Sequence, residues 1–206
     1  VWNDWAGQKD PLKPFLNHLD SISAHINQAP EGQATGQLSN ATENQEYLLD
    51  IDPITENQEK LFDWYKTQKN LVAYGAAGTG KTFITLYNAL REVLDERSPY
   101  DKIYIVRSLV ATREIGFLPG SHDDKADIYQ IPYKNMVKYM FQMPNDADFE
   151  MLYGNLKGQE TIKFWSTSFL RGTTLDNAII IVDEFQNLTF HELDSIMTRV
   201  GENSKI

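Results

Sequence analysis

Residues 75–82 have the composition of a phosphate-binding loop. They read Gly-Ala-Ala-Gly-Thr-Gly-Lys-Thr and fit the pattern G-x-x-x-x-G-K-S/T. Small residues let backbone amides approach phosphate oxygens, and a following helix adds free amides and the positive end of its dipole. We predict that Lys81 contacts the β- and γ-phosphates and Thr82 ligates Mg²⁺. The loop residues predicted to bind ATP are Gly75, Ala76, Ala77, Gly78, Thr79, Gly80, Lys81 and Thr82.

A second group of residues could complete that site. The apolar run 179–182 ends in Asp183-Glu184, and a buried parallel strand delivers its carboxyl end to the crevice where nucleotides bind. We predict that Asp183 holds Mg²⁺ through water and that Glu184 polarises the attacking water. By itself an apolar run followed by two acids also suits a solvent-exposed strand end. Gln186 could bond to the attacking water and the γ-phosphate, or could simply begin a loop.

Strands alternating with helices are expected to position these residues. Apolar runs predict strands at 71–74, 103–106, 161–165 and 178–182, and helical spacing or caps predict helices at 55–65, 81–96, 124–142 and 189–200. Solidly apolar strands in this alternation are typical of a parallel sheet covered on both faces. The fold class predicted is therefore α/β. A glycine-rich turn between a strand and a helix is the alternative for 75–82, but the flanking elements are those that a phosphate loop requires.

The N-terminal quarter of the chain differs in composition. Residues 1–28 carry apolar residues at helical spacing, which predicts a short separate helical segment. Residues 29–50 are predicted to be a linker, rich in Gly, Gln, Ser, Thr and Asn up to residue 44. Residues 51–206 form the main domain. Because the chain starts at Val1 and stops after Lys205-Ile206, we expect it to be a fragment of a longer protein, with a domain truncated at its C-terminus.

Bulk composition limits the possible partners. The net charge of −10 argues against a general polyanion-binding surface, so any nucleic-acid contact needs a local cluster of Lys and Arg. The absence of cysteine from the sequence excludes disulfides and thiolate metal sites and suits a reducing compartment. No apolar run approaches the roughly 18 residues of a membrane span. We expect a cytoplasmic protein with no membrane association.

Three further segments follow the phosphate loop in a distinctive order. They are Glu114-Ile115-Gly116-Phe117-Leu118-Pro119-Gly120, Leu170-Arg171-Gly172-Thr173-Thr174-Leu175 and Asp183-Glu184-Phe185-Gln186-Asn187. With them, residues 53–206 resemble the phosphate-starvation-inducible PhoH family, ATPases similar to the first RecA-like domain of superfamily 1 helicases. The resemblance implies a P-loop NTPase (RecA-like) three-layer sandwich and ATP hydrolysis with Mg²⁺. Phage-borne members occur, and the divergent N-terminal segment suits one, which would then act in the host cytoplasm.

The resemblance also implies roles for single residues. Gln58 falls where helicase-like ATPases place a glutamine that reads the adenine edge, although its spacing from Thr55 also suits a capping box. Arg107 and Arg171 match positions that suit nucleic-acid or inter-subunit contacts, with an ion pair at a strand end as the alternative. Phe117 could stack on a base or cover the core.

Two features depart from the family pattern. Phe185 stands where bacterial members usually have Ala. The family also continues past the equivalent of Ile206 into another core strand, a nucleotide-sensing Gly-Asp turn and an arginine finger. Their absence from this sequence favours ATP binding over hydrolysis in this segment.

Three functions fit these patterns. The leading hypothesis is an ATPase, helicase-like, that acts on single-stranded RNA or other nucleic acid. The alternative is a nucleotide-dependent oligomeric switch or assembly protein, a homo-oligomer that moves no strand, which the acidic balance slightly favours. A small-molecule kinase would require an acceptor pocket and a lid, for which the sequence gives no sign.

Overall fold

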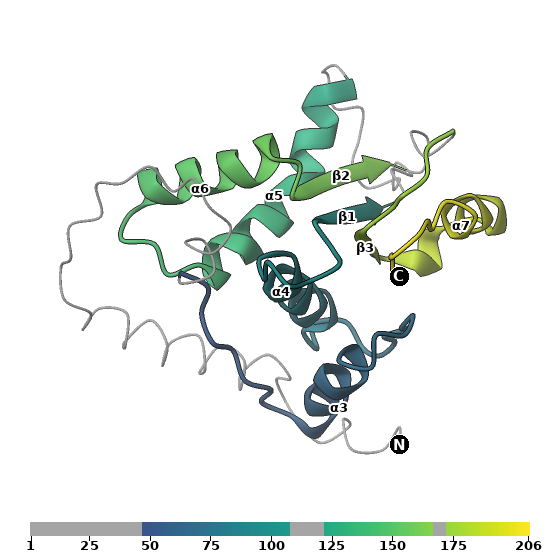
Figure 1. The fold of residues 1–206 in the computed structure, drawn as a ribbon, viewed down its shortest axis with the longest axis horizontal. Coiled ribbons are helices and arrows are strands. Elements are labelled where there is room, and N and C mark those ends of the chain that lie inside the picture. Colours follow the sequence, from purple (N-terminus) through teal and green to yellow (C-terminus); the bar gives the residue numbers. More distant parts are fainter. Residues whose placement is uncertain (1–46, 108–121, 167–171) are drawn as a thin grey trace.

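The computed structural model describes residues 47–107, 122–166 and 172–206 (Figure 1). Some of the predictions fall outside the described residues. These are the helical segment 1–28, most of the linker 29–50, and the candidate residues Phe117 and Arg171. In chain order the elements are α3 (Glu56–Tyr65), α4 (Lys81–Val93), β1 (Lys102–Arg107), α5 (His122–Met140), α6 (Asp146–Gly158), β2 (Ile162–Ser166), β3 (Ala178–Val182), the 3-10 helix η2 (Phe185–Asn187) and α7 (Phe190–Met197).

The sheet is parallel, with strand order β2-β1-β3. Ile103 of β1 lies opposite Ile162 of β2 and Ile179 of β3. β1 is central, and its four middle residues are buried. This is the arrangement expected of strands that are apolar on both faces.

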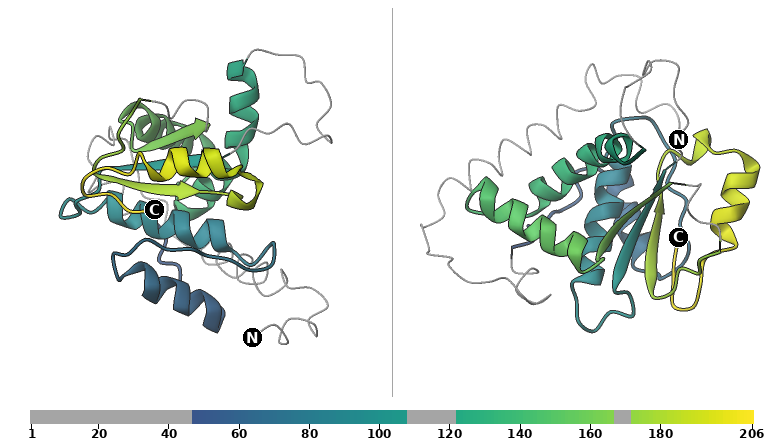
Figure 2. Two further views of the ribbon diagram at one scale, coloured as in Figure 1. Left: turned by 90° about the vertical axis from the view of Figure 1, so that its right-hand side faces the viewer. Right: turned by 90° about the horizontal axis from the view of Figure 1, so that it is seen from above.

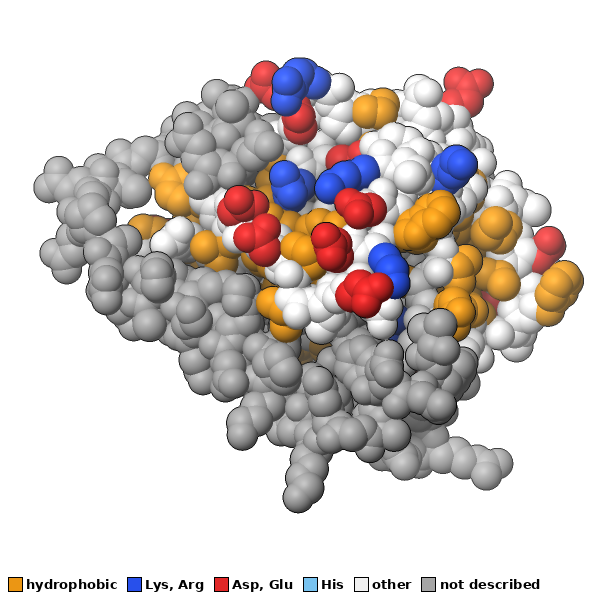
Figure 3. All heavy atoms as spheres, turned by 90° about the horizontal axis from the view of Figure 1, so that it is seen from below, with side chains coloured by type: hydrophobic (Ala, Val, Ile, Leu, Met, Phe, Trp, Pro, Cys, Tyr) orange, Lys and Arg blue, Asp and Glu red, His pale blue; other side chains and the backbone are white. Residues whose placement is uncertain are grey.

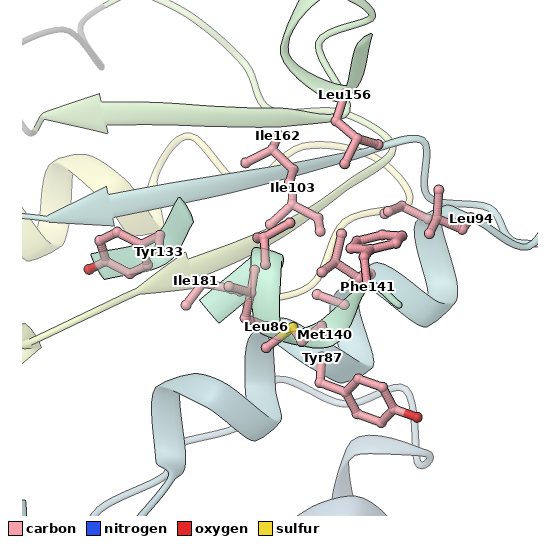
Figure 4. Packing of buried hydrophobic residues seen from close by; sticks show 14 of the residues in the cluster. Leu86, Tyr87, Leu94, Ile103, Tyr133, Met140, Phe141, Leu156, Ile162 and Ile181 are labelled. Carbon is pink, nitrogen blue, oxygen red and sulfur yellow. The ribbon is translucent and has the colours of Figure 1, made fainter. Parts of the chain in front are cut away.

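Alternation along the strands divides the core into two layers. Ile103 and Ile105 pack with residues of α4, α5 and α6, whereas Tyr104 and Val106 pack with Ile196 of α7. Figure 2 shows α4, α5 and α6 on one side of the sheet and α7 on the other. Figure 4 shows the larger layer, where side chains from these helices meet the strands. The predicted α/β fold with helices on both faces of a parallel sheet is confirmed.

The α6 helix is an element that our sequence analysis did not predict. Its signals were present: Asn145 caps it, its side chain accepting a hydrogen bond from the Asp148 amide. Phe149, Leu152 and Leu156 follow at helical spacing and are buried. The neighbouring α5 was predicted at 124–142 and contains Pro132 within its length.

The strand predicted at 71–74 is absent, which corrects the sequence analysis. A strand needs a ladder of backbone partners, and here Leu71 donates its amide to the Ile206 carbonyl at 2.9 Å at the very start of the run. Val72 and Tyr74 are 71 % and 81 % exposed, so the run is not buried as a core strand would be. It still leads directly into the phosphate loop.

The end of the predicted linker is attached to the domain. Leu49 donates its amide to the Met140 carbonyl at 2.8 Å, and Tyr47 accepts from the Gln142 amide at 2.7 Å. Residues 47–50, the end of the predicted linker 29–50, are thus docked on the end of α5. Among the described residues, every helix is too short or too polar to cross a membrane.

Candidate nucleotide site

The phosphate loop connects residue 74 to the first turn of α4 at the carboxyl edge of the sheet. Gly78 and Gly80 have φ values of 73° and 83°, a left-handed conformation that favours glycine. Gly80 is the N-cap of α4, and a Cβ atom added there would lie 3.4 Å from Gln58 Nε2. These backbone requirements explain the glycines of the motif.

Lys81 is held by the loop itself. Its Nζ donates to the carbonyls of Gly75 at 3.0 Å and Ala76 at 2.7 Å. The Thr79 hydroxyl donates to the same Ala76 carbonyl at 3.0 Å. The ammonium group therefore lies across the loop, with neutral carbonyls as its partners.

Thr82 and Asp183, the two predicted magnesium ligands, are brought together by the fold. The Thr82 hydroxyl donates to Asp183 Oδ1 at 3.0 Å across 101 residues of sequence. Asp183 follows β3 directly, and its amide donates to the Val106 carbonyl of β1 at 3.0 Å. The start of α4 and the carboxyl end of β3 thus meet at one point.

Tyr133 is a site residue that the sequence analysis missed. Its hydroxyl donates to Asp183 Oδ2 at 2.6 Å from the interior of α5. Burial, and then the charge and hydrogen bond of Asp183, raise the pKa of Tyr133 well above its usual value, while Arg107 acts against the shift. Tyr133 is therefore protonated and is the donor. A tyrosine at a helical position carries no motif, so spacing alone could not have identified it.

Glu184 and Gln186 lie next to each other on the exposed turn after β3. Gln186 Nε2 donates to Glu184 Oε2, and the Glu184 amide donates to Asp183 Oδ1 at 3.1 Å. Glu184 has a φ of 52°, in the left-handed region, and is the N-cap residue of η2, so the backbone turns away from the strand at this residue. The adjacent Phe185 is 40 % exposed.

Gln58 links α3 to the phosphate loop. Its Oε1 accepts from the Ile54 amide at 2.9 Å, and its Nε2 donates to the Thr79 carbonyl at 3.3 Å. The Thr55 side chain accepts from the Gln58 amide at 3.3 Å, so one half of the predicted capping box is present. The other half is replaced by the bond to Ile54. Gln58 therefore lies beside the loop, and its role in adenine recognition stays a prediction.

Arg107 ends β1 at the same edge of the sheet. Its guanidinium carbon lies 6.0 Å from the centroid of the Tyr129 ring on α5. The positive charge of Arg107 also acts against the rise in the pKa of Tyr133. Of the three residues predicted to contact nucleic acid or another subunit, Arg107 alone lies in the described part of the chain, and it faces the α5 side of the site.

The oxygen atoms at this edge suit Mg²⁺. A threonine hydroxyl and an aspartate carboxylate are hard ligands, and Mg²⁺ is usually bound by one or two carboxylates together with phosphates and water. In the described residues no group of three or more His, Cys, Asp or Glu side chains converges as a self-sufficient metal site. The Thr82 hydroxyl and the Asp183 carboxylate are thus of the ligand types that suit Mg²⁺.

Comparisons with known proteins show which family this chain resembles. The family described as "PhoH-like protein" matches residues 50–206. The chain is 31% identical over 159 residues to "Protein PhoH" of Escherichia coli, covering 75% of this chain and 43% of that protein. It is 33% identical over 133 residues to "Protein PhoH2" of Bacillus subtilis, covering 64% and 29%. A "PhoH-like protein" of Synechocystis is 35% identical over 142 residues, covering 68% and 40%. The chain spans less than half the length of these relatives.

Proposed function

The chain belongs to the PhoH-like protein family, a family of P-loop NTPases, and from this premise we propose that it binds Mg·ATP and hydrolyses it. Nucleotide binding follows from family membership, and the choice of ATP and of Mg²⁺ is our proposal. The observation that carries it is the 3.0 Å hydrogen bond between Thr82 and Asp183. It joins the two residues whose oxygens would hold the metal.

The phosphate loop would bind the triphosphate with groups that are already in place. Lys81 now bonds to two neutral carbonyls, and a phosphate oxygen is a stronger partner for an ammonium group than a carbonyl is. Thr82 and Asp183 would hold the magnesium ion, which when bound would neutralise charge on the β- and γ-phosphates.

Glu184 is the residue that we propose orients the attacking water. It follows the metal-binding Asp183 directly, and Gln186 holds its carboxylate from two residues away. Phosphoryl transfer depends mainly on positioning and charge stabilisation, so a held carboxylate at this point suits the task. Gln186 would then contact both Glu184 and the γ-phosphate.

The first test separates binding from turnover. Lys81→Ala should abolish Mg·ATP binding in calorimetry, because the only cation of the loop is lost. Glu184→Gln should bind Mg·ATP as the wild type does and release phosphate at least about a hundredfold more slowly. Lys66→Ala, which removes an exposed lysine on the turn after α3, is the matched control and should change neither measurement. Equal phosphate release by Glu184→Gln and the wild type would remove Glu184 from this role.

We further propose that the protein uses ATP hydrolysis to act on single-stranded RNA or another nucleic acid. The support is the resemblance to helicase-like ATPases, while charge argues for restricted contact. On the face seen in Figure 3, basic and acidic side chains are interspersed and form no large area of one sign. Binding would therefore need a small set of cations, such as Arg107.

RNA dependence of the ATPase rate distinguishes this proposal from its alternative. Single-stranded RNA should stimulate phosphate release at low salt, and the stimulation should fade at higher salt because phosphate contacts release counterions. The net charge of −10 favours the second candidate, a nucleotide-dependent oligomeric switch. Unchanged rates with RNA at both salt concentrations, together with an ATP-dependent change in oligomeric mass, would favour the switch.

A further inference from the structure

Tyr133 lies outside every motif identified in the sequence, yet its side chain is buried and its hydroxyl is hydrogen-bonded. It is 2 % exposed, and its ring packs against Phe164 of β2 with the two centroids 5.4 Å apart. Figure 4 shows its hydroxyl directed toward the carboxyl ends of the strands, away from the apolar cluster. The ring is thus fixed between α5 and the sheet, and only the oxygen reaches the nucleotide site.

The hydroxyl completes the hydrogen bonding of the Asp183 carboxylate. Oδ1 accepts from the Thr82 hydroxyl at 3.0 Å and from the Glu184 amide at 3.1 Å, while Oδ2 accepts from Tyr133 at 2.6 Å. A carboxylate held at both oxygens has one orientation. Without the bond at Oδ2, rotation about the last side-chain torsion would be limited only by the two hydrogen bonds at Oδ1, from the Thr82 hydroxyl and the Glu184 amide.

We infer that Tyr133 is a positioning residue that orients Asp183 for Mg²⁺ and thereby couples α5 to the metal half of the nucleotide site; the inference rests on the proposed function. Tyr133 does not contact the nucleotide in this role. Partners that orient metal ligands typically change metal affinity by about 10- to 100-fold when they are removed.

A second contact ties the same face of α5 to the sheet edge. Tyr129 and Tyr133 are four residues apart and therefore lie on one side of the helix. The Arg107 guanidinium, at the end of β1, lies 6.0 Å from the Tyr129 ring. A displacement of this part of α5 would move both contacts together. The position of α5 would then set how firmly Asp183 is held, and hence the affinity for Mg²⁺.

The test removes the hydroxyl and keeps the ring. For Tyr133→Phe, binding of a fluorescent ATP analogue is measured against Mg²⁺ concentration and again in EDTA. We expect the Mg²⁺ concentration for half-maximal binding to rise about tenfold, with binding in EDTA unchanged. Tyr153→Phe alters another buried tyrosine, on α6, and should leave both curves unchanged. An unaltered Mg²⁺ dependence in Tyr133→Phe would overturn the inference.

A double variant shows whether the effect passes through Asp183. In an Asp183→Asn background, Tyr133→Phe should produce no further shift in Mg²⁺ dependence, because there is no longer a carboxylate to orient. An equal shift in both backgrounds would mean that Tyr133 acts by another route and would also overturn the inference. Absence of any Mg²⁺ dependence in the wild type would instead overturn the proposed function on which it rests.

Discussion

Two polar networks join the opposite ends of α4 to distant parts of the chain. At the N-terminal end, Thr82 bonds to Asp183, 101 residues later. At the C-terminal end, Glu92 forms an ion pair with Lys205, 113 residues later. We use the name Lys205 cluster for the second network, whose members are Lys205, Glu92, Gln68, Tyr65 and Tyr100.

In the Lys205 cluster the ammonium group already has several partners. The Lys205 ammonium lies 3.9 Å from the centroid of the Tyr65 ring and 5.0 Å from that of Tyr100. It donates to Gln68 Oε1 at 3.2 Å and to the Glu92 carboxylate. The side chains of Lys205 and Glu92 are only 6% and 21% exposed. Burial lowers the pKa of Lys205, and the Glu92 carboxylate acts against that shift.

The comparison shows what distinguishes a binding site from a structural ion pair. Lys205 already has a carboxylate and two aromatic faces, so a further anion would gain little from it. In the described part of the chain, the Lys81 ammonium bonds to backbone carbonyls only, and its charge is therefore available to a phosphate. The same residue type thus stabilises the fold at one end of α4 and is expected to serve a ligand at the other.

The largest expected effect on stability comes from disrupting the Lys205 cluster. Lys205→Met should lower the free energy of unfolding by about 3 kcal/mol, because it leaves the Glu92 carboxylate buried without its partner. Urea unfolding followed by circular dichroism measures this. Lys60→Met removes the cation of an exposed pair with Glu56 and should cost less than about 1 kcal/mol. Equal costs for the two variants would contradict the structural role of the Lys205 cluster.

A change in the network at the N-terminal end of α4, where Thr82 bonds to Asp183, should instead affect ligand binding more than stability. Asp183→Asn should weaken Mg²⁺-dependent ATP binding at least about tenfold, yet alter the free energy of unfolding by about 1 kcal/mol or less, since the amide still accepts a hydrogen bond. Calorimetry and urea unfolding provide the two measurements. Asp194→Asn on α7 is the exposed control. A variant that binds Mg·ATP normally would show that Asp183 holds no metal.

The smallest expected effect on stability comes from removing a single hydroxyl in the Lys205 cluster. The Tyr65 hydroxyl is buried and, within the described residues, has no hydrogen-bond partner, so Tyr65→Phe should change stability by less than about 1 kcal/mol at pH 7. Burial, followed by the charge of Glu92, raises the pKa of Tyr65 well above the usual value for a tyrosine, which is about 10. Above pH 10 the unfolded chain loses this proton while the native state keeps it, so native stability falls as pH rises.

Tyr65→Phe should therefore lose less stability than the wild type between pH 9 and pH 11, by up to about 1.4 kcal/mol per pH unit. Unfolding in urea at several pH values gives the slope. Tyr74→Phe, at a side chain that is 81 % exposed, should follow the wild type. Parallel curves for Tyr65→Phe and the wild type would contradict the assigned burial of this hydroxyl.

Much of the fold and part of the site could be predicted because their signals are local. The apolar run 178–182 predicted β3, and the glycines and Lys81 of the phosphate loop reflect backbone requirements of one short segment. The strand predicted at 71–74 was wrong because strand formation depends on partners elsewhere, and the run has its backbone contact with Ile206 only at its first residue. Tyr133 was missed because its importance comes from one contact with a residue 50 positions away.

The sequence by itself determined which chemical groups the protein offers: an ammonium, a hydroxyl and an acidic pair, each next to an element that could present it. Only the tertiary structure decided which of them meet. Parallel pairing of β1 and β3 carries Asp183 to the start of α4, and the packing of α5 on β2 adds Tyr133 to the same carboxylate. The physical reason is that a hydrogen bond depends on distance in space, which the order of residues along a chain does not specify.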